Sequence, residues 1–426
     1  MKKSKFIKSS IILIIGGMIL KAVGLLTKII LTRKIGIDMQ GLYSLILPTY
    51  LLIISISNFA LPSSLNVLIS SNRFNNKNLI IYALLISLSL DFIIIIIMVF
   101  ISKYLALNML KNEILTYPLM CTALTLPFIT ISNILRSYYF AKERILPHVI
   151  SNILEDIIKL ILIIIFIDKI INNKILTLSF IVLINIVSEL SSIIIFISLL
   201  KKININKEDI KLNKKNLKEI FKISIPQVIS RLIGSITYFL EPIILTYVLI
   251  DNNYIVHNYG LINGYILPLI LIPSFFTNAI SSALIPIVSK NYTNKNYKYV
   301  LYKIKQALVI ALIIGLISTT IFLLYGKSLL KIIFNVNEGY NYILILAPIF
   351  LLHYMEQILL NSLIAINKTK INMFISFINM FIRTIILFIF LKLNFKIYAL
   401  IISIALNILF TSIYSAYKLN KYLLIK

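Results

Sequence analysis

The segment SIILIIGGMILKAVGLLTKIIL, residues 10–31, is an apolar run that contains two lysines, Lys21 and Lys28. A membrane-spanning helix takes about 20 apolar residues, so this run is long enough to cross a bilayer. Lys21 lies at its midpoint, and Lys28 lies two helical turns further along on the same face. A cation at the bilayer centre costs roughly 2.5–3.5 kcal/mol, and proteins keep such residues where they face a protein or water-filled interior. The segment therefore predicts a membrane helix that lines a cavity.

A later apolar span repeats this pattern. The run Lys21-Ala-Val-Gly24 returns as Arg231-Leu-Ile-Gly234, again with the cation inside an apolar stretch. We expect the two cations to occupy equivalent places in two repeated halves of the chain. Another pair of positions repeats in the same way: Glu155 and Lys159 in the first half, Asn379 and Arg383 in the second.

Composition excludes an ordinary soluble domain. Hydrophobic residues make up 59% of the 426 residues and charged residues 13%, and the mean hydropathy is +0.97, which is typical of a polytopic membrane protein. The single cysteine, Cys121, excludes a disulfide framework, and the three histidines show no metal-ligand spacing. We expect no metal site and no cofactor, with a coupling Na⁺ or H⁺ left open.

Hydropathy predicts an all-α polytopic membrane protein with twelve spans in two six-helix lobes. With six spans in each lobe, equivalent helices have the same orientation, so the lobes are expected to be related by a pseudo-twofold axis along the membrane normal. The expected spans are 10–31, 42–70, 79–101, 114–140, 149–167, 176–200, 223–250, 258–287, 303–325, 342–366, 371–391 and 397–417. The expected domains are an N-terminal lobe (1–200), a basic cytoplasmic linker (201–222), a C-terminal lobe (223–417) and a cytoplasmic tail (418–426).

The net charge of +27 follows from topology. With both termini in the cytoplasm, the inner loops and tails hold more than twice as many Lys and Arg residues as the outer loops, which is the positive-inside pattern. Nucleic acid is therefore not needed to explain the charge, and we expect none as a partner. Membrane lipids are expected partners, since the basic linker can contact anionic headgroups.

Five cations within the spans are candidate substrate-binding residues, because Lys and Arg hold a diphosphate strongly at low dielectric and Arg can do so bidentately. They are Lys21, Lys28, Lys159, Arg231 and Arg383. The alternative is structural pairing with the acids of the spans, among them Glu155, Asp156, Glu189 and Glu241; Lys28 could also reach the membrane interface. Three acids are candidates for ion coupling or charge pairing: Glu155, Asp156 and Glu241, with Glu241 favoured because Pro242 loosens the backbone there.

Other motifs point away from enzyme chemistry. Arg136 lies near the cytoplasmic end of its span, so we expect it to anchor that end at the lipid headgroups. Gly326-Lys-Ser328 ends like a phosphate-binding loop, but Ile321 stands where the first glycine belongs. We expect no catalytic residue and a transporter rather than an enzyme.

Five runs carry a resemblance to a known family: Leu20–Gly36 (LKAVGLLTKIILTRKIG), Gly41–Pro48 (GLYSLILP), Glu241–Leu245 (EPIIL), Tyr259–Pro268 (YGLINGYILP) and Pro273–Pro286 (PSFFTNAISSALIP). They resemble the stage V sporulation protein B family, which belongs with the lipid II flippases in the MOP superfamily of polysaccharide exporters and multidrug extruders. The similarity extends over nearly the whole chain.

The resemblance implies a MATE/MOP-like transporter of the bacterial cytoplasmic membrane that moves an undecaprenyl-diphosphate-linked saccharide outward. It also implies that the first, second, seventh and eighth spans face the cavity, where Lys21, Lys28 and Arg231 match basic positions of the family. Family members commonly have Arg at the two lysine positions. This chain therefore keeps the positive charge there but lacks the planar guanidinium group that can bind a phosphate through two N–H groups.

The sequence therefore predicts a flippase for a lipid-linked saccharide such as lipid II, with cell-wall synthesis proteins as possible further partners. Three alternatives stay open. A cation-coupled multidrug extruder of the same fold usually carries cations, which the basic cavity would repel. A glycan polymerase or ligase calls for a sizeable outer loop, which the sequence lacks. A non-transporting membrane scaffold would give the repeated cations no evident role.

Overall fold

The computed structural model describes residues 2–70, 75–142, 144–199 and 214–424, and within these ranges every regular element is a helix. The helices belong to two compact units, Met1–Ser235 and Ile236–Lys426. Most of the linker expected at 201–222 lies outside the described residues, and its last part, from Lys214, begins a helix. The expected tail from 418 continues the last helix to Leu424.

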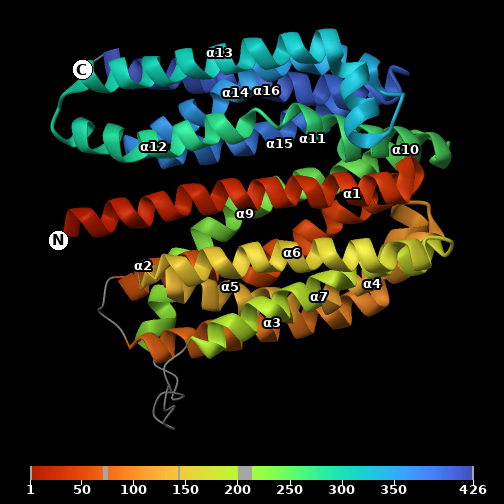
Figure 1. Cartoon of the computed structure of the whole chain (residues 1–426), viewed down its shortest axis with the longest axis horizontal. Helices are drawn as coiled ribbons and strands as arrows, with labels where there is room; N and C mark the ends of the chain where they lie inside the picture. The colour runs from red at the N-terminus through yellow and green to blue at the C-terminus, as the bar shows by residue number, and fades with distance from the viewer. Residues whose placement is uncertain (1, 71–74, 143, 200–213, 425–426) are drawn as a thin grey trace. The chain divides into compact units, whose positions relative to one another are not determined.

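The first unit is built from long helices joined by short turns (Figure 1). Its elements are α1 (Lys2–Asn58), α2 (Leu61–Ser70), α3 (Asn76–Tyr104), η1 (Leu105–Met109), η2 (Glu113–Leu115), α4 (Thr116–Leu124), α5 (Leu126–Ala141), α6 (Ile145–Ile170), α7 (Lys174–Ser198) and the first part of α9 (Lys214–Val248).

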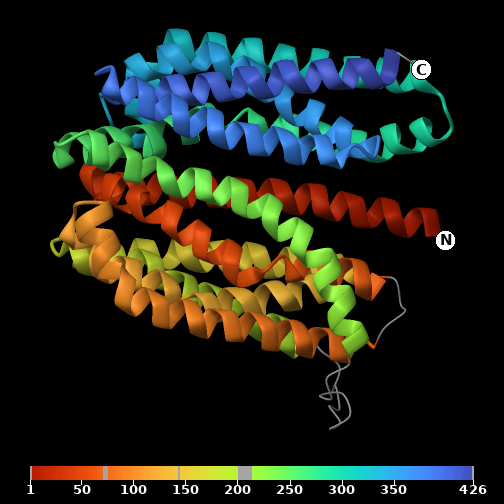
Figure 2. The ribbon, with the colours of Figure 1, turned by 180° about the vertical axis from the view of Figure 1, so that it is seen from behind.

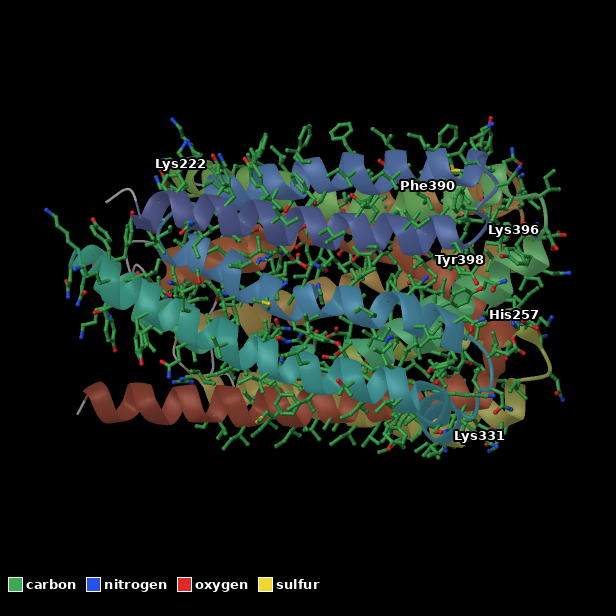
Figure 3. All side chains as sticks on the ribbon, turned by 90° about the horizontal axis from the view of Figure 1, so that it is seen from above. Lys222, His257, Lys331, Phe390, Lys396 and Tyr398 are labelled. Atoms are coloured by element: carbon green, nitrogen blue, oxygen red, sulfur yellow. The ribbon has the colours of Figure 1, made fainter. Side chains whose placement is uncertain are left out.

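The second unit takes up the rest of α9 and the helices that follow it. Its elements are α10 (Asn252–Gly260), η3 (Leu261–Ile266), α11 (Leu267–Ile270), α12 (Ser274–Thr293), α13 (Tyr297–Leu329), η4 (Leu330–Phe334), α14 (Tyr340–Ala365), α15 (Thr369–Lys392) and α16 (Tyr398–Leu424). Figure 3 places Phe390, Lys396, Tyr398, His257 and Lys331 together at one end of these helices, where the sequence predicts outer loops.

The described residues contain nine helical stretches long and apolar enough to cross a membrane, or ten if the pair Asn252–Ile270 and Ser274–Thr293, bent by 56°, is one broken span. One stretch, Ile15–Ser70, has 56 residues; at 1.5 Å per residue this is about 84 Å, enough for two crossings of a hydrocarbon core of about 30 Å. α6 is as long as a span but carries five charged residues. The prediction of an all-α polytopic membrane fold is confirmed.

Large apolar side chains on the outer faces of the helices are what a lipid-facing surface requires. Phe92 and Phe100 of α3 are 66% and 77% exposed, and Leu324 of α13 is 69% exposed. Exposure of this extent is unfavourable in water and favourable against lipid tails. The cores lie between the helices: in the first unit, α2, α3, α5 and α9 meet around Leu65 and Ile134.

The first two predicted spans are joined by a kink and not by a loop. Helix α1 continues through residues 32–41, and only Gly36 departs from helical geometry, with φ 73° and ψ 177°. The second predicted span then breaks at Phe59 and Ala60, both with positive φ, before α2 begins. A short loop and a one-residue kink are hard to distinguish in a sequence, because both need a glycine beside polar residues.

Gly36→Ala is expected to lower the free energy of unfolding by about 1–3 kcal/mol, because this backbone region is nearly exclusive to glycine. A Cβ at Gly36 would meet no atom within 4 Å, so the effect comes from the backbone and not from a clash. The control is Gly17→Ala on the same helix, which also meets no atom within 4 Å and should raise stability by about 0.5–1 kcal/mol. Denaturant unfolding in detergent measures both; equal stabilisation by the two variants would contradict the kink.

Candidate functional site

Helix α1 packs along α6 over much of its length, and this contact positions the first two candidate cations (Figure 1). The helices approach closely because Gly16 faces Val149: a Cβ there would lie 2.2 Å from Val149 Cγ1. Farther along, the Cβ position of Gly24 is 3.9 Å from Asp156 Oδ2. In the same part of α1, Lys21 is exposed and Lys28 is partly buried.

Lys159 belongs to a buried cluster of charges in the first unit. Its Nζ donates to Glu155 Oε1 at 2.7 Å, one helical turn away on α6. Arg136 of α5 approaches the other oxygen, with 2.8 Å between Nη2 and Glu155 Oε2. Glu155 is therefore bonded by two cations, and it is 8% exposed.

Arg136 is the residue whose predicted role is wrong. It was expected to reach the headgroups, but its side chain is only 18% exposed and it also donates to Ser132 and Asn133. The partner Glu155 is 19 residues away on the next helix, and nothing in a single sequence fixes the rotation that brings the two together. A signal was present, since the span next to it carries acids that need a cation.

Arg231 lies on α9 and is exposed, with its Nη2 donating to Ser63 Oγ of α2 at 2.7 Å. The same stretch of α9 is fixed to the first unit by two more hydroxyl pairs, Ser64 with Ser224 at 2.6 Å and Ser55 with Ser235 at 2.7 Å. Figure 2 shows the first turns of α9 beside α2. Arg231 is therefore held at one nitrogen, while the rest of its guanidinium is available to a ligand.

Arg383 is paired within the second unit. Its Nη2 and Nε lie 2.6 and 2.9 Å from Glu241 Oε2, and Tyr259 donates to Glu241 Oε1 at 3.1 Å. The guanidinium also stacks over the Tyr238 ring, 4.7 Å from its centroid. Both oxygens of Glu241 are therefore bonded, and a coupling ion there would have to displace Arg383.

Two further intramembrane acids have polar partners, and only one of the two could be assigned from sequence spacing. Asp91 of α3 is 1% exposed and accepts from Ser57 at 2.5 Å and Thr130 at 2.6 Å, both distant in sequence. Glu356 lies 2.9 Å from His353 Nδ1 on the same turn of α14, an (i, i+3) spacing that was visible in the sequence.

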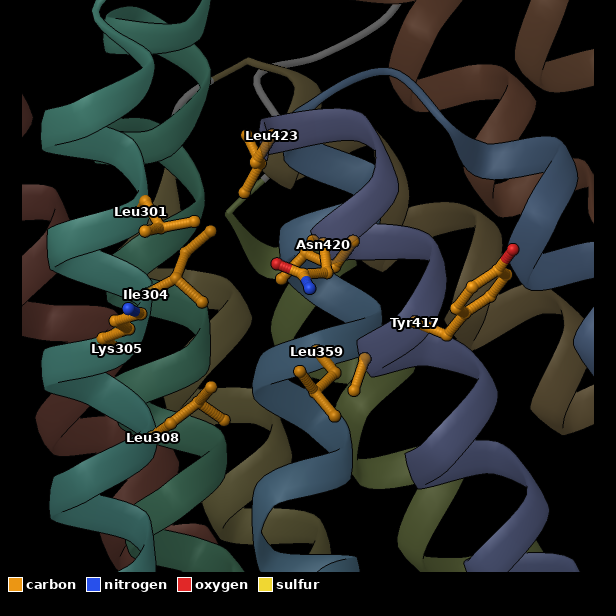
Figure 4. Close-up of a pocket in the computed structure, with 10 residues that line it drawn as sticks. Leu301, Ile304, Lys305, Leu308, Leu359, Tyr417, Asn420 and Leu423 are labelled. Carbon is orange, nitrogen blue, oxygen red and sulfur yellow. The ribbon is translucent and has the colours of Figure 1, made fainter. Parts of the chain in front are cut away.

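A groove in the second unit has a different chemistry (Figure 4). It has a volume of about 330 Å³ and lies between α13, α14 and α16, where Leu301, Leu308 and Leu359 line it. Lys305 and Asn420 are its polar residues, and Tyr417 also lines it. Such a lining suits an apolar chain better than a saccharide.

The candidate cations thus fall into two groups. Lys159 and Arg383 bond glutamates within their own units, as Arg136 does. Lys28 and Arg231 form no ion pair with any acidic side chain in the part of the chain that the structure describes. The same described residues contain no group of three or more His, Cys, Asp or Glu side chains that could hold a metal.

A family model described as polysaccharide biosynthesis protein matches residues 6–292. The chain belongs to this family. The match begins before the first predicted span and ends with α12, so it includes Lys21, Lys28 and Arg231.

Two relatives in Bacillus subtilis (strain 168) extend the similarity to the rest of the chain. Stage V sporulation protein B is 28% identical over 405 residues, covering 91% of this chain and 78% of the relative. Sporulation protein YkvU is 23% identical over 388 residues, covering 86% of this chain and 84% of the relative. The resemblance recognised in the sequence is confirmed.

The fold is similar to that of solved MATE transporters. The inward-facing structure of a multidrug resistance MATE family transporter matches with a TM-score of 0.76 at 15% identity, covering 94% of this chain and 95% of that one. The predicted MATE-like fold is therefore confirmed, and the function has to be argued from the polar groups of this chain.

Proposed function

We propose that the chain is a flippase that moves an undecaprenyl-diphosphate-linked saccharide, of the lipid II kind, outward across the cytoplasmic membrane by alternating access. The observation that carries the proposal is the absence of an acidic partner for Lys28 and Arg231 in the described helices. A cation kept in a membrane without a protein counter-ion implies that an anionic ligand supplies one.

A diphosphate fits these groups. Arg231 is held by Ser63 through one nitrogen, which leaves the other N–H groups for a bidentate contact with phosphate oxygens. Lys28 offers a compact charge of the kind that also binds phosphate. Lys21, exposed on the same helix, adds a third cation, so the first unit supplies the charge that the substrate headgroup needs.

The family assignment supports the saccharide part of the proposal. The matched family is described as polysaccharide biosynthesis protein, and the name of one relative, Stage V sporulation protein B, places that protein in sporulation. Both descriptions suit export of a lipid-linked cell-surface precursor. We also propose cytoplasmic termini, from the positive-inside distribution of Lys and Arg.

The membrane potential can drive the step. An inside-negative potential of 100 mV contributes roughly 2.3 kcal/mol for each negative charge moved outward. A diphosphate therefore gains free energy in the export direction, provided that the carrier does not return compensating charge.

A liposome experiment tests the proposal. Purified wild type should bind and translocate lipid II, and Arg231→Ala should weaken binding about 10- to 100-fold, since a hydrogen bond to a charged group contributes roughly 1.5–3 kcal/mol. Lys21→Ala should act in the same direction. The matched control is Lys331→Ala, which removes an exposed cation at the end of the second unit and should leave transport unchanged.

The same liposomes separate the proposal from its rival. A wild type that ignores lipid II but extrudes a cationic dye would be a multidrug transporter, and the flippase proposal would fail. Equal transport of lipid II by wild type and both alanine variants would support the flippase activity but contradict the assignment of Arg231 and Lys21 as substrate-binding residues.

A further inference from the structure

Glu189 is the buried carboxyl of the first unit with the poorest set of partners. It lies on α7, is 6% exposed, and its Oε2 is buried without a hydrogen bond. The nearest cationic atom, Arg136 Nη2, is 3.5 Å from this oxygen. The same nitrogen already donates to Glu155 at 2.8 Å and to Ser132 at 3.1 Å.

The groups around Glu189 come from three helices. Arg136 and the hydroxyl group of Ser132 lie beside it on α5, Glu155 and Lys159 on α6, and Tyr50 on α1. Helix α4, which also packs on α7, has no acidic or basic residue. Of the two cations, Lys159 bonds Glu155 and Arg136 bonds it more closely than it approaches Glu189.

This arrangement leaves Glu155 fully paired and Glu189 underpaired. Burying a carboxylate oxygen without a hydrogen bond is unfavourable, and uptake of a proton on that oxygen removes the buried charge. Two carboxyl groups that share one guanidinium nitrogen also repel each other when both are ionised, so they titrate as a pair.

The other buried acids of the described helices lack this feature. The two oxygens of Asp91 accept from two hydroxyl groups, and those of Glu241 are bonded by Arg383 and Tyr259. Glu356 has His353 beside it.

We propose that Glu189 is a proton-binding site of this transporter. Its Oε2 takes up a proton while Arg136 bonds Glu155, and it releases the proton to water when Arg136 shifts its hydrogen bond to Glu189. The link of this proton to substrate movement rests on the proposed function; the binding of the proton does not. The ligand is thus a single proton, and no other reactant is needed.

Infrared spectroscopy of the purified full chain tests proton binding without any substrate. Wild type should show carbonyl bands of protonated carboxyl groups, with the shift that deuterium oxide produces, and Glu189→Gln should lose one of them. Glu189→Asp keeps a carboxyl group and should retain a band. Glu113→Gln, which changes an exposed acid of the same unit, is the matched control and should leave the band intact.

Three outcomes overturn the proposal. An unchanged band in Glu189→Gln would assign the proton to another acid, and the lack of any such band in wild type would mean that Glu189 is ionised. A carboxylate band that responds to Na⁺ and disappears in Glu189→Gln would make the ligand sodium instead. If the band follows Glu189 but lipid II is not moved, the proton site stands and the proposed function fails.

For the coupling itself, lipid II translocation is measured in liposomes with and without a pH gradient. Wild type should respond to the gradient, and Glu189→Gln should run at the rate seen without one. An identical response of wild type and Glu189→Gln to the pH gradient would show that proton binding at Glu189 is not coupled to transport.

Discussion

Replacing Arg383 by methionine is expected to lower the free energy of unfolding by about 3–5 kcal/mol, the typical effect of removing one partner of a buried ion pair. Glu241 is 2% exposed, and without Arg383 only Tyr259 would donate to it. The loss is expected to be large because the remaining carboxylate cannot reach water. Methionine keeps much of the side-chain volume, so the effect reports on charge and hydrogen bonding rather than on a cavity.

Denaturant unfolding in detergent gives the measurement, with two companion variants. Arg383→Lys keeps the charge but loses the two-nitrogen contact and should fall between wild type and Arg383→Met. The double change Arg383→Met with Glu241→Gln should recover most of the loss, because removing both charges of a buried pair is often nearly neutral. A loss under about 1 kcal/mol for Arg383→Met would mean that the pair is hydrated and not structural.

The second large effect is expected at Glu155. Glu155→Gln should lower the free energy of unfolding by about 3 kcal/mol, because Arg136 and Lys159 both lose their closest carboxylate. Lys159→Gln should have a smaller effect, since Glu155 keeps Arg136. The order of the two variants is therefore the sharper test, and an equal or larger effect for Lys159→Gln would contradict the assignment of Glu155 as the centre of the cluster.

These two predictions also distinguish the roles of the cations. If the paired cations serve structure, their variants should lose stability first and transport only as a result. Arg231→Ala should do the opposite, with little change in unfolding and a loss of lipid II binding. Measuring stability and binding on the same preparations separates a structural from a ligand-binding cation.

Much of the fold can be predicted from the sequence, because a run of about 20 apolar residues is the length needed to cross the bilayer. The apolar runs predict the helices, and the charge of the loops explains the basic composition. What the sequence left undecided is how the helices break: Gly36 kinks one continuous helix where a loop was expected, and Thr125 separates α4 from α5 inside one predicted span. These details depend on packing around each break.

For the candidate site, too, some features could be predicted from the sequence and others could not. The cations inside the predicted spans were visible from the order of residues in the sequence. The (i, i+4) spacing of Glu155 and Lys159 was visible in the same way. Pairing across helices was not: Glu241 and Arg383 are separated by 142 residues, and their contact needs a particular rotation of α9 and α15. Arg136 was misplaced for this reason.

The kink at Gly36 divides α1 into two arms, and the first arm is attached to α6. Gly16 lets the helices touch at Val149, and Lys34 bonds Asp168 and approaches the Ile164 carbonyl near the other end. The first arm and α6 therefore form one packed pair of helices on one side of the kink. If α1 bends at Gly36 during transport, we expect these contacts to hold the first arm and α6 together, so that the spacing between Lys21 or Lys28 and the carboxylates of α6 is kept.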